Sequence, residues 1–329
     1  MKIFTKQIFP FCILLCMAGF LAAQQAEKLT IYSIKGPSGV ALIRLFENPP
    51  GAAGFDIKAE ALAQADLMAA KFISGEAKIG ILPPNVAAKI ASSGKRIQVA
   101  AVTGAGMLSL LSADPSVRRL EDLKGKSVEV AGQGATPDYV FRKILLSKGI
   151  NPDRDISLGY SLAYPEIAQS LIAGRVSIAL LPEPFATMAR TGNGRLNLVG
   201  DIQDEWAKLH APGASSSSGS SANYPMTVLV VDRDFAAAHV PLMRLILDAV
   251  KDSVEWVVSR PVEAGRLVEK HELGLRAQAA GAAIPRSNYV FIPASRARQS
   301  LEDLFRAFLD FAPASIGGAL PGDDFYYQY

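Results

Sequence analysis

Residues 123–149 read LKGKSVEVAGQGATPDYVFRKILLSKG, and this stretch decides the fold. Its first part alternates and is rich in Val, which predicts a strand over residues 127–131. Gly132 and Gly134 then allow a sharp turn, and Thr136 suits the N-cap of the helix that follows. The backbone N–H groups of such a corner can hold an anion or a polar ligand edge, although the turn can equally be a plain connection.

The same pattern occurs earlier in the chain. Residues 29–46 read LTIYSIKGPSGVALIRLF, with Ser38 in the place of Thr136. Residues 72–87, FISGEAKIGILPPNVA, likewise match residues 171–186, LIAGRVSIALLPEPFA. Each half therefore carries two matching corners in the same order. This repeat predicts an α/β protein with two similar lobes, and because ligands bind beyond the carboxyl ends of strands, it also predicts a ligand cleft between them.

The amino-terminal segment is typical of a secretory signal peptide. Residues 1–23 combine early lysines with an apolar run and small residues. A retained membrane anchor is disfavoured because Pro10 interrupts the run, which is shorter than the ~20 apolar residues of a spanning helix. Both cysteines lie in this segment, and lipidation of Cys16 is disfavoured because the larger Leu15 precedes it. We therefore expect a mature, cysteine-free protein in the periplasm or another extracytoplasmic space.

The order of apolar runs predicts how the chain divides. We expect lobe 1 to comprise residues 24–112 and 224–329, and lobe 2 to comprise residues 113–223. The chain then crosses between the lobes twice, near Ser112 and near Tyr224. Two crossings between compact lobes predict closure about a hinge.

Charge and motif content disfavour several classes of function. The sequence has 34 Lys and Arg and 31 Asp and Glu, without the basic excess that nucleic-acid binding needs. His210, His239 and His271 are isolated, and no zinc-protease, dinucleotide or phosphate-loop motif is complete. The sequence therefore predicts neither a metal site nor a cofactor, and no enzyme. A mechanism based on carboxylates stays open as the alternative.

Five segments together resemble the solute-binding proteins of ABC importers, in the nitrate/sulfonate/taurine and thiamine-pyrimidine (NMT1-like, SsuA-like) group. They are GEAKIGILPPNVAAKI, DLKGKSVEVAGQGATPDYVFRKILLSKGI, LIAGRVSIALLPEPFATM, MTVLVVDRDFAAAHVPLM and VEWVVSRPVEA. The resemblance implies a type II-like periplasmic-binding-protein fold that closes on a small molecule as a monomer. It also implies delivery to a membrane permease with its ATPase. A lyase or dehydratase on the same fold is the alternative, but it would need a convergent acid/base pair. A pyrimidine-synthesising enzyme of the same group uses a cysteine-rich loop, and no cysteine follows Cys16.

The repeat places the expected ligand contacts in loops at strand ends, with two tyrosines nearby that could stack on a flat ring. These residues are Gly36, Pro37, Ser38, Pro84, Asn85, Gly134, Ala135, Thr136, Tyr164, Glu183, Pro184 and Tyr224. Ser38 and Thr136 have the alternative role of simple helix caps. The four loops contain no Arg, and one contains Glu183. This favours a neutral or partly cationic heteroaromatic metabolite, such as a vitamin or pyrimidine precursor, over nitrate, sulfonate or taurine.

Overall fold

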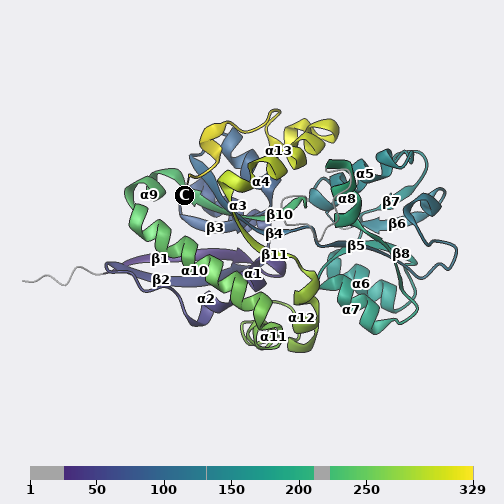
Figure 1. Cartoon of the computed structure of the whole chain (residues 1–329), viewed down its shortest axis with the longest axis horizontal. Coiled ribbons are helices and arrows are strands. Elements are labelled where there is room, and N and C mark those ends of the chain that lie inside the picture. The colour runs from purple at the N-terminus through teal and green to yellow at the C-terminus, as the bar shows by residue number, and fades with distance from the viewer. Residues whose placement is uncertain (1–25, 131, 211–222, 329) are drawn as a thin grey trace, which may run out of the picture.

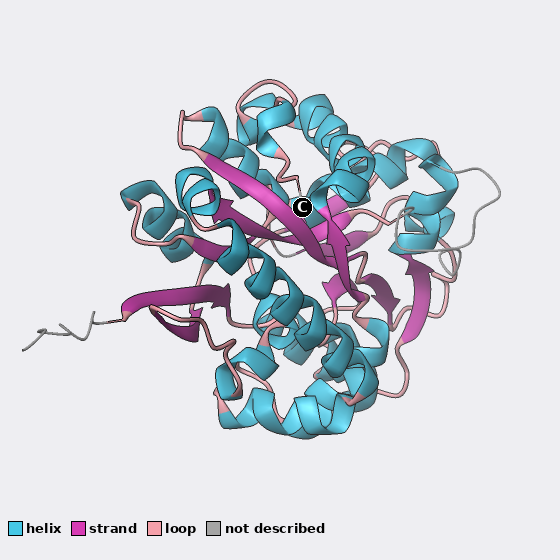
Figure 2. Cartoon of the chain, turned by 60° about the vertical axis from the view of Figure 1, so that its left-hand side comes forward, coloured by secondary structure: helices cyan, strands magenta, loops and turns pink. Residues whose placement is uncertain are grey.

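The computed structural model describes residues 26–130, 132–210 and 223–328. The predicted signal peptide and both cysteines lie outside the described residues. The chain forms two α/β lobes, each built on one sheet, with helices packed around the strands (Figures 1 and 2). We call the part around the six-stranded sheet lobe 1 and the part around the five-stranded sheet lobe 2.

Lobe 1 contains both ends of the described chain. Its strands are β1 (Glu27–Ile34), β2 (Phe55–Leu62), β3 (Ile79–Leu82), β4 (Ile97–Ala105), β10 (Pro225–Asp232) and β11 (Tyr289–Pro293). Its helices are α1 (Pro37–Ala41), α2 (Ile43–Glu47), α3 (Ala65–Ser74), α4 (Pro84–Ser92), α9 (Arg233–Ala238), α10 (Val240–Ser259), α11 (Pro261–Lys270), α12 (Ala277–Ala283) and α13 (Ala294–Phe311). Short 3₁₀ turns are η4 (Ile284–Arg286), η5 (Pro313–Ile316) and η6 (Asp323–Phe325).

Lobe 2 is the middle part of the chain. Its strands are β5 (Leu108–Ser112), β6 (Ser127–Val130), β7 (Ser157–Gly159), β8 (Ile178–Pro182) and β9 (Asn197–Asp201). Its helices are η1 (Leu120–Leu123), α5 (Thr136–Ser147), α6 (Tyr164–Ile172), α7 (Phe185–Gly192) and α8 (Ile202–His210).

The sheet topology confirms the internal repeat. The order is β2-β1-β3-β10-β4-β11 in lobe 1 and β7-β6-β8-β5-β9 in lobe 2. In both sheets the first three strands are parallel, and the next strand, β10 or β5, runs antiparallel to them. The matched segments IGIL and IALLP form the buried central strands β3 and β8. Because these strands are covered on both faces, they read as continuous apolar runs.

Two details differ from the sequence-based expectations. The first crossing does not lie at Ser112, because β5 already pairs with β8 and β9; the chain changes sheets between Ala105 and Leu108. Thr136 is not the N-cap of α5, which is Ala135. Thr136 is the first helical residue, and its buried hydroxyl has no hydrogen-bond partner among the residues that the structure describes. Helix ends read from sequence are commonly displaced by a residue or two.

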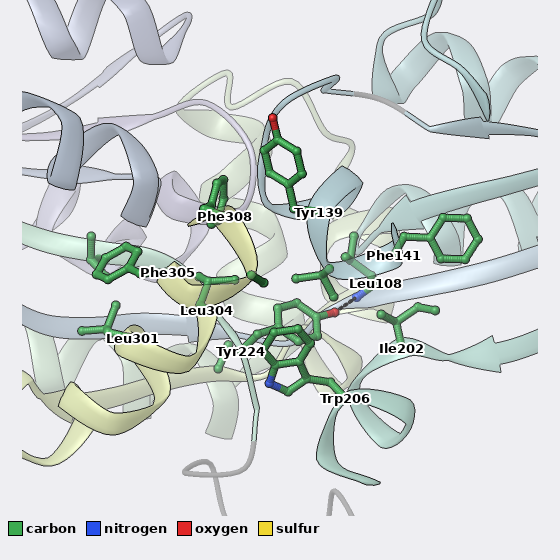
Figure 3. Packing of buried hydrophobic residues seen from close by; sticks show 14 of the residues in the cluster. Leu108, Tyr139, Phe141, Ile202, Trp206, Tyr224, Leu301, Leu304, Phe305 and Phe308 are labelled. Atoms are coloured by element: carbon green, nitrogen blue, oxygen red, sulfur yellow. Dashed lines mark hydrogen bonds between the residues drawn. The ribbon is translucent and has the colours of Figure 1, made fainter. Parts of the chain in front are cut away.

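One apolar core joins the two lobes on the side of α5 and α13. It contains Phe141 and Trp206 of lobe 2 together with Leu304 and Phe308 of lobe 1 (Figure 3). Tyr139 packs its ring edge-on against Phe308, with a centroid separation of 4.9 Å. An ion pair between Lys143 and Asp310 (2.6 Å) lies outside this contact. The two lobes therefore share one hydrophobic core, in addition to the two chain crossings that connect them.

The two chain crossings meet beside this shared core. Gly106 N–H donates to the Tyr224 carbonyl (2.8 Å). The Tyr224 side chain is fully buried, and its hydroxyl donates to Gln203 Oε1 (2.7 Å) and accepts from the Leu108 N–H (3.3 Å; Figure 3). Gln203 Oε1 also accepts from the Leu108 N–H (2.8 Å). These contacts fix the relative position of the crossings.

Candidate functional site: a cleft between the lobes

A cavity of about 380 Å³ is lined by residues of both lobes. Lobe 1 contributes the ends of β1 and β3 and the start of β10, and lobe 2 contributes the ends of β8 and the starts of α6 and α7. Most lining side chains are apolar, including Ile34, Leu82, Met107, Phe185 and Met226. Another cavity, of about 350 Å³, lies between α4 and the carboxyl-terminal segment, but only lobe 1 lines it. The first cavity matches the predicted cleft because it lies at strand ends of both lobes.

The lobe 1 wall is the corner after β1. Gly36 has φ +102°, a backbone conformation that glycine adopts without strain, and α1 begins at Pro37. The Ser38 hydroxyl accepts from the Ile34 N–H (3.1 Å) and donates to the Ile34 carbonyl (2.8 Å). Ser38 therefore ties the corner back to the end of β1. It is not the helix cap that the alternative reading expected, because the N-cap of α1 is Gly36 and no side-chain cap hydrogen bond forms there.

Lys35 is the one charged residue among the described residues that line the cavity. Its side chain is exposed, and within the described part of the chain it makes neither an ion pair nor a hydrogen bond. An amine in this position can bind an anionic or acceptor group of a ligand at the cavity edge.

The lobe 2 wall is aromatic. Tyr164, at the start of α6, stacks on Phe185, at the start of α7, with centroids 5.8 Å apart and an interplanar angle of 24°. Burial raises the pKa of Tyr164 to about 12, so its hydroxyl keeps its proton at neutral pH. Phe185 also packs against the cores of both lobes. The pair offers a flat apolar surface with one polar atom.

The glycine turn before α5 does not line this cavity, and the chain's own carboxylate occupies one of its backbone donors. The Gly134 N–H donates to Asp138 Oδ2 (2.9 Å). Asp138 Oδ1 accepts from Arg142 Nε (2.7 Å) and from the Tyr160 hydroxyl (2.6 Å), and Asp138 is only 3% exposed. The Gly134 N–H, which the sequence suggested as a donor to an anion, therefore already has an internal partner.

Asp138→Asn should lower the free energy of unfolding by about 2 kcal/mol, because the partly buried Arg142 loses one of its two carboxylates. Urea denaturation measures this loss. Glu166→Gln is the matched control, since Glu166 is an exposed carboxylate that accepts from one backbone N–H (2.9 Å), and it should cost less than about 1 kcal/mol. Equal midpoints for both variants would contradict the structural role of Asp138.

Eight predicted contact residues lie outside the cavity lining: Pro84, Asn85, Gly134, Ala135, Thr136, Glu183, Pro184 and Tyr224. Tyr224 belongs to the buried crossing, and Asn85 lies within the first turn of α4, with its buried Oδ1 unpartnered. Glu183 is 3% exposed, and its Oε2 accepts from the Thr187 N–H (3.0 Å). Burial raises the pKa of Glu183, against the lowering effects of Thr187 and of the Arg286 and Arg190 charges.

The structure brings together Gly36, Pro37, Ser38 and Tyr164 at the cavity. The sequence reasoning missed Met107, Met226 and Thr227, and it also missed the matched prolines Pro83 and Pro182, which both line the cavity. The signal for the prolines was available, because they are equivalent positions of the repeat. In the loops after β3 and β8 the predicted contacts lie one or two residues beyond the prolines that line the cavity, whereas the loop before α5 contributes no residue to the lining.

Comparison with known proteins agrees with this arrangement. The NMT1-like family model matches residues 68–269, more than half of the chain. An ABC transporter structure from Parabacteroides distasonis is similar over 91% of this chain and 98% of its own, with a TM-score of 0.75 and 24% identity. The periplasmic aliphatic sulphonate binding protein SsuA from Escherichia coli is similar over 92% of both chains (TM-score 0.69, 16% identity).

The periplasmic nitrate-binding protein NrtA from Synechocystis is similar over 89% of this chain and 84% of its own, with a TM-score of 0.62 and 11% identity. No curated protein matches the sequence. The fold is thus the two-lobed α/β fold of periplasmic solute-binding proteins. The chain belongs to the NMT1-like family.

The described residues contain no group of three or more His, Cys, Asp or Glu side chains that could hold a metal ion. They also contain no helix that is long and apolar enough to cross a membrane.

Proposed function

We propose that this protein is the solute-binding component of an ABC importer, which captures a small molecule in the cleft and delivers it to a permease with its ATPase. The observation that carries the proposal is that the cavity of about 380 Å³ takes its walls from the strand ends of both lobes. A ligand held by both walls favours a closed form of the protein. Family membership and the similarity to solute-binding proteins support the same function. We further propose that the protein acts as an extracytoplasmic monomer.

The composition of the cavity favours binding over catalysis. The described residues that line it include no carboxylate and no imidazole, so the carboxylate-based mechanism that the sequence left open has no residue to carry it in this cavity. Turnover of a bound ligand by the purified protein would contradict this proposal.

The residues that line the cavity also change the expected charge of the ligand. The expectation of a partly cationic ligand depended on Glu183, which lies outside the lining, whereas Lys35 lies within it. We propose a flat, largely apolar ligand that is neutral or anionic, with a heteroaromatic metabolite such as a pyrimidine precursor as the first candidate. Tyr164 and Phe185 support this choice because their stacked rings form one wall. An alkanesulfonate is the second candidate, and Lys35 is the observation that favours it.

A thermal-shift panel should identify the ligand class. It would compare neutral pyrimidines, heteroaromatic carboxylates, thiamine, alkanesulfonates and nitrate. A true ligand at one hundred times its Kd should add ~2.7 kcal/mol of stability. Solution scattering with the same ligand should show contraction if the lobes close. Stabilisation by thiamine alone would contradict the proposed charge preference.

Lys35→Gln should raise the Kd of an anionic ligand about tenfold and leave that of a neutral ligand nearly unchanged. Isothermal titration calorimetry measures both. Lys28→Gln is the matched control, because Lys28 is exposed near the opposite end of β1 and does not line the cavity. An equal effect of the two substitutions would mean that only general charge is involved.

A further inference from the structure

A separate pocket of about 250 Å³ lies where lobe 2 meets lobe 1 at α7 and α12. Thr187, Arg190, Thr191, Gly194 and Leu196 of lobe 2 line it together with Arg286 of lobe 1. None of them lines the ligand cavity. The pocket is thus another place where the two lobes form one concave surface.

The pocket has an excess of positive charge. Within the described part of the chain, Arg190 and Arg286 make no ion pair and no hydrogen bond, and the one acidic group on which both charges are seen to act is Glu183. That carboxylate is buried, and it already accepts the Thr187 N–H. The two guanidinium groups therefore act on a single carboxylate without forming an ion pair with it, and the pocket lining itself contains no acidic residue.

Two threonine hydroxyls add donors to the same pocket. Thr187 is 5% exposed, and among the described residues its Oγ1 lacks a hydrogen bond of good geometry, although it interacts with the Glu183 carboxylate and lowers the pKa of that group. A buried hydroxyl whose hydrogen bond is poor can donate to a better-placed acceptor. Thr191 adds a second hydroxyl to the same lining.

We propose that this pocket binds a small oxyanion of the sulfate or phosphate type between Arg190 and Arg286. Planar guanidinium groups bind such anions through paired N–H donors, and Thr187 Oγ1 can donate to a further oxygen. Because Arg190 belongs to lobe 2 and Arg286 to lobe 1, the bound oxyanion holds the two lobes together on this side. The site does not depend on the identity of the transported ligand.

The test is a titration of the ligand-free protein with sodium sulfate and with sodium phosphate. Ionic strength is held constant with sodium chloride, and the melting temperature is recorded. The wild-type melting temperature should rise and saturate. Arg190→Gln and Arg286→Gln should each weaken the apparent affinity about tenfold or more. In chloride alone both variants should melt close to wild type, because each removes one of two like charges and also one of two charges that favour the ionised form of Glu183.

Arg266→Gln is the matched control. Arg266 is an exposed arginine of α11 that does not line the pocket, and this variant should respond as wild type does. A rise that never saturates and is equal in all four proteins would show only exclusion of the salt from the protein surface, and would overturn the proposal. Saturable binding that survives both pocket substitutions would overturn it as well.

Discussion

Replacing Phe308 with alanine is expected to lower the free energy of unfolding by about 4 kcal/mol. Phe308 is fully buried in the core shared by the two lobes, where its ring packs against Tyr139 of α5 (Figure 3). The substitution removes this aromatic contact and leaves a cavity at the junction of α5 and α13. Urea denaturation followed by tryptophan fluorescence measures the loss, because Trp206 lies in the same core.

Two control variants test whether the cost comes from lost buried volume and whether it depends on the buried position of Phe308. Phe308→Leu keeps most of the buried volume and should cost about 1–2 kcal/mol. Phe311→Ala removes a ring that also stacks on Tyr139 (5.7 Å) but is only partly buried, so its cost should be smaller than that of Phe308→Ala. If the shared core couples the lobes, wild type unfolds in one transition and Phe308→Ala broadens or splits it. A cost below about 1 kcal/mol for Phe308→Ala would contradict the stabilising role of the core shared by the two lobes.

Gly106→Ala is expected to cost about 3 kcal/mol. Gly106 has φ +33°, and a Cβ atom added there would lie 2.3 Å from Gln203 Cγ and 3.2 Å from Gln203 Cβ. The extra methyl group combines backbone strain with overpacking beside the buried hydrogen bonds of the two crossings. Chemical denaturation measures the cost, and ligand titration shows whether the crossings still allow binding.

Gly54→Ala isolates the effect of the contact. Gly54 also has positive φ (+82°), but an added Cβ would meet no atom within 4 Å. It should therefore cost only about 1 kcal/mol, from backbone strain alone. Equal costs at the two positions would mean that the space around Gly106 adjusts freely.

The repeat in the sequence was enough to predict the two lobes and their cleft. Each half carries the same strand order around a buried central strand, and local patterns report such strands well. The first crossing was misplaced because β5 is an apolar run that suits either sheet. Only its pairing with β8 and β9 assigns it to lobe 2.

The candidate site could be predicted only in part, for a physical reason. A residue's place in a loop does not say whether its polar atoms are already used. Glu183 and Tyr224 looked available, but burial and hydrogen bonds to Thr187 and Gln203 engage them. The partners of Asp138 include Tyr160, which is 22 residues away along the chain, so no local pattern could reveal that contact.

Within lobe 2, the carboxylate of Asp138 accepts hydrogen bonds from the turn before α5 and from Arg142. That turn is held in place before any solute arrives, so solute binding need not order it. Discrimination among solutes is then left to the corner after β1 and to the Tyr164–Phe185 wall. For a biosensor built on this scaffold, specificity can be redesigned at those two walls, while the α5 turn serves as a fixed frame for reporting lobe motion.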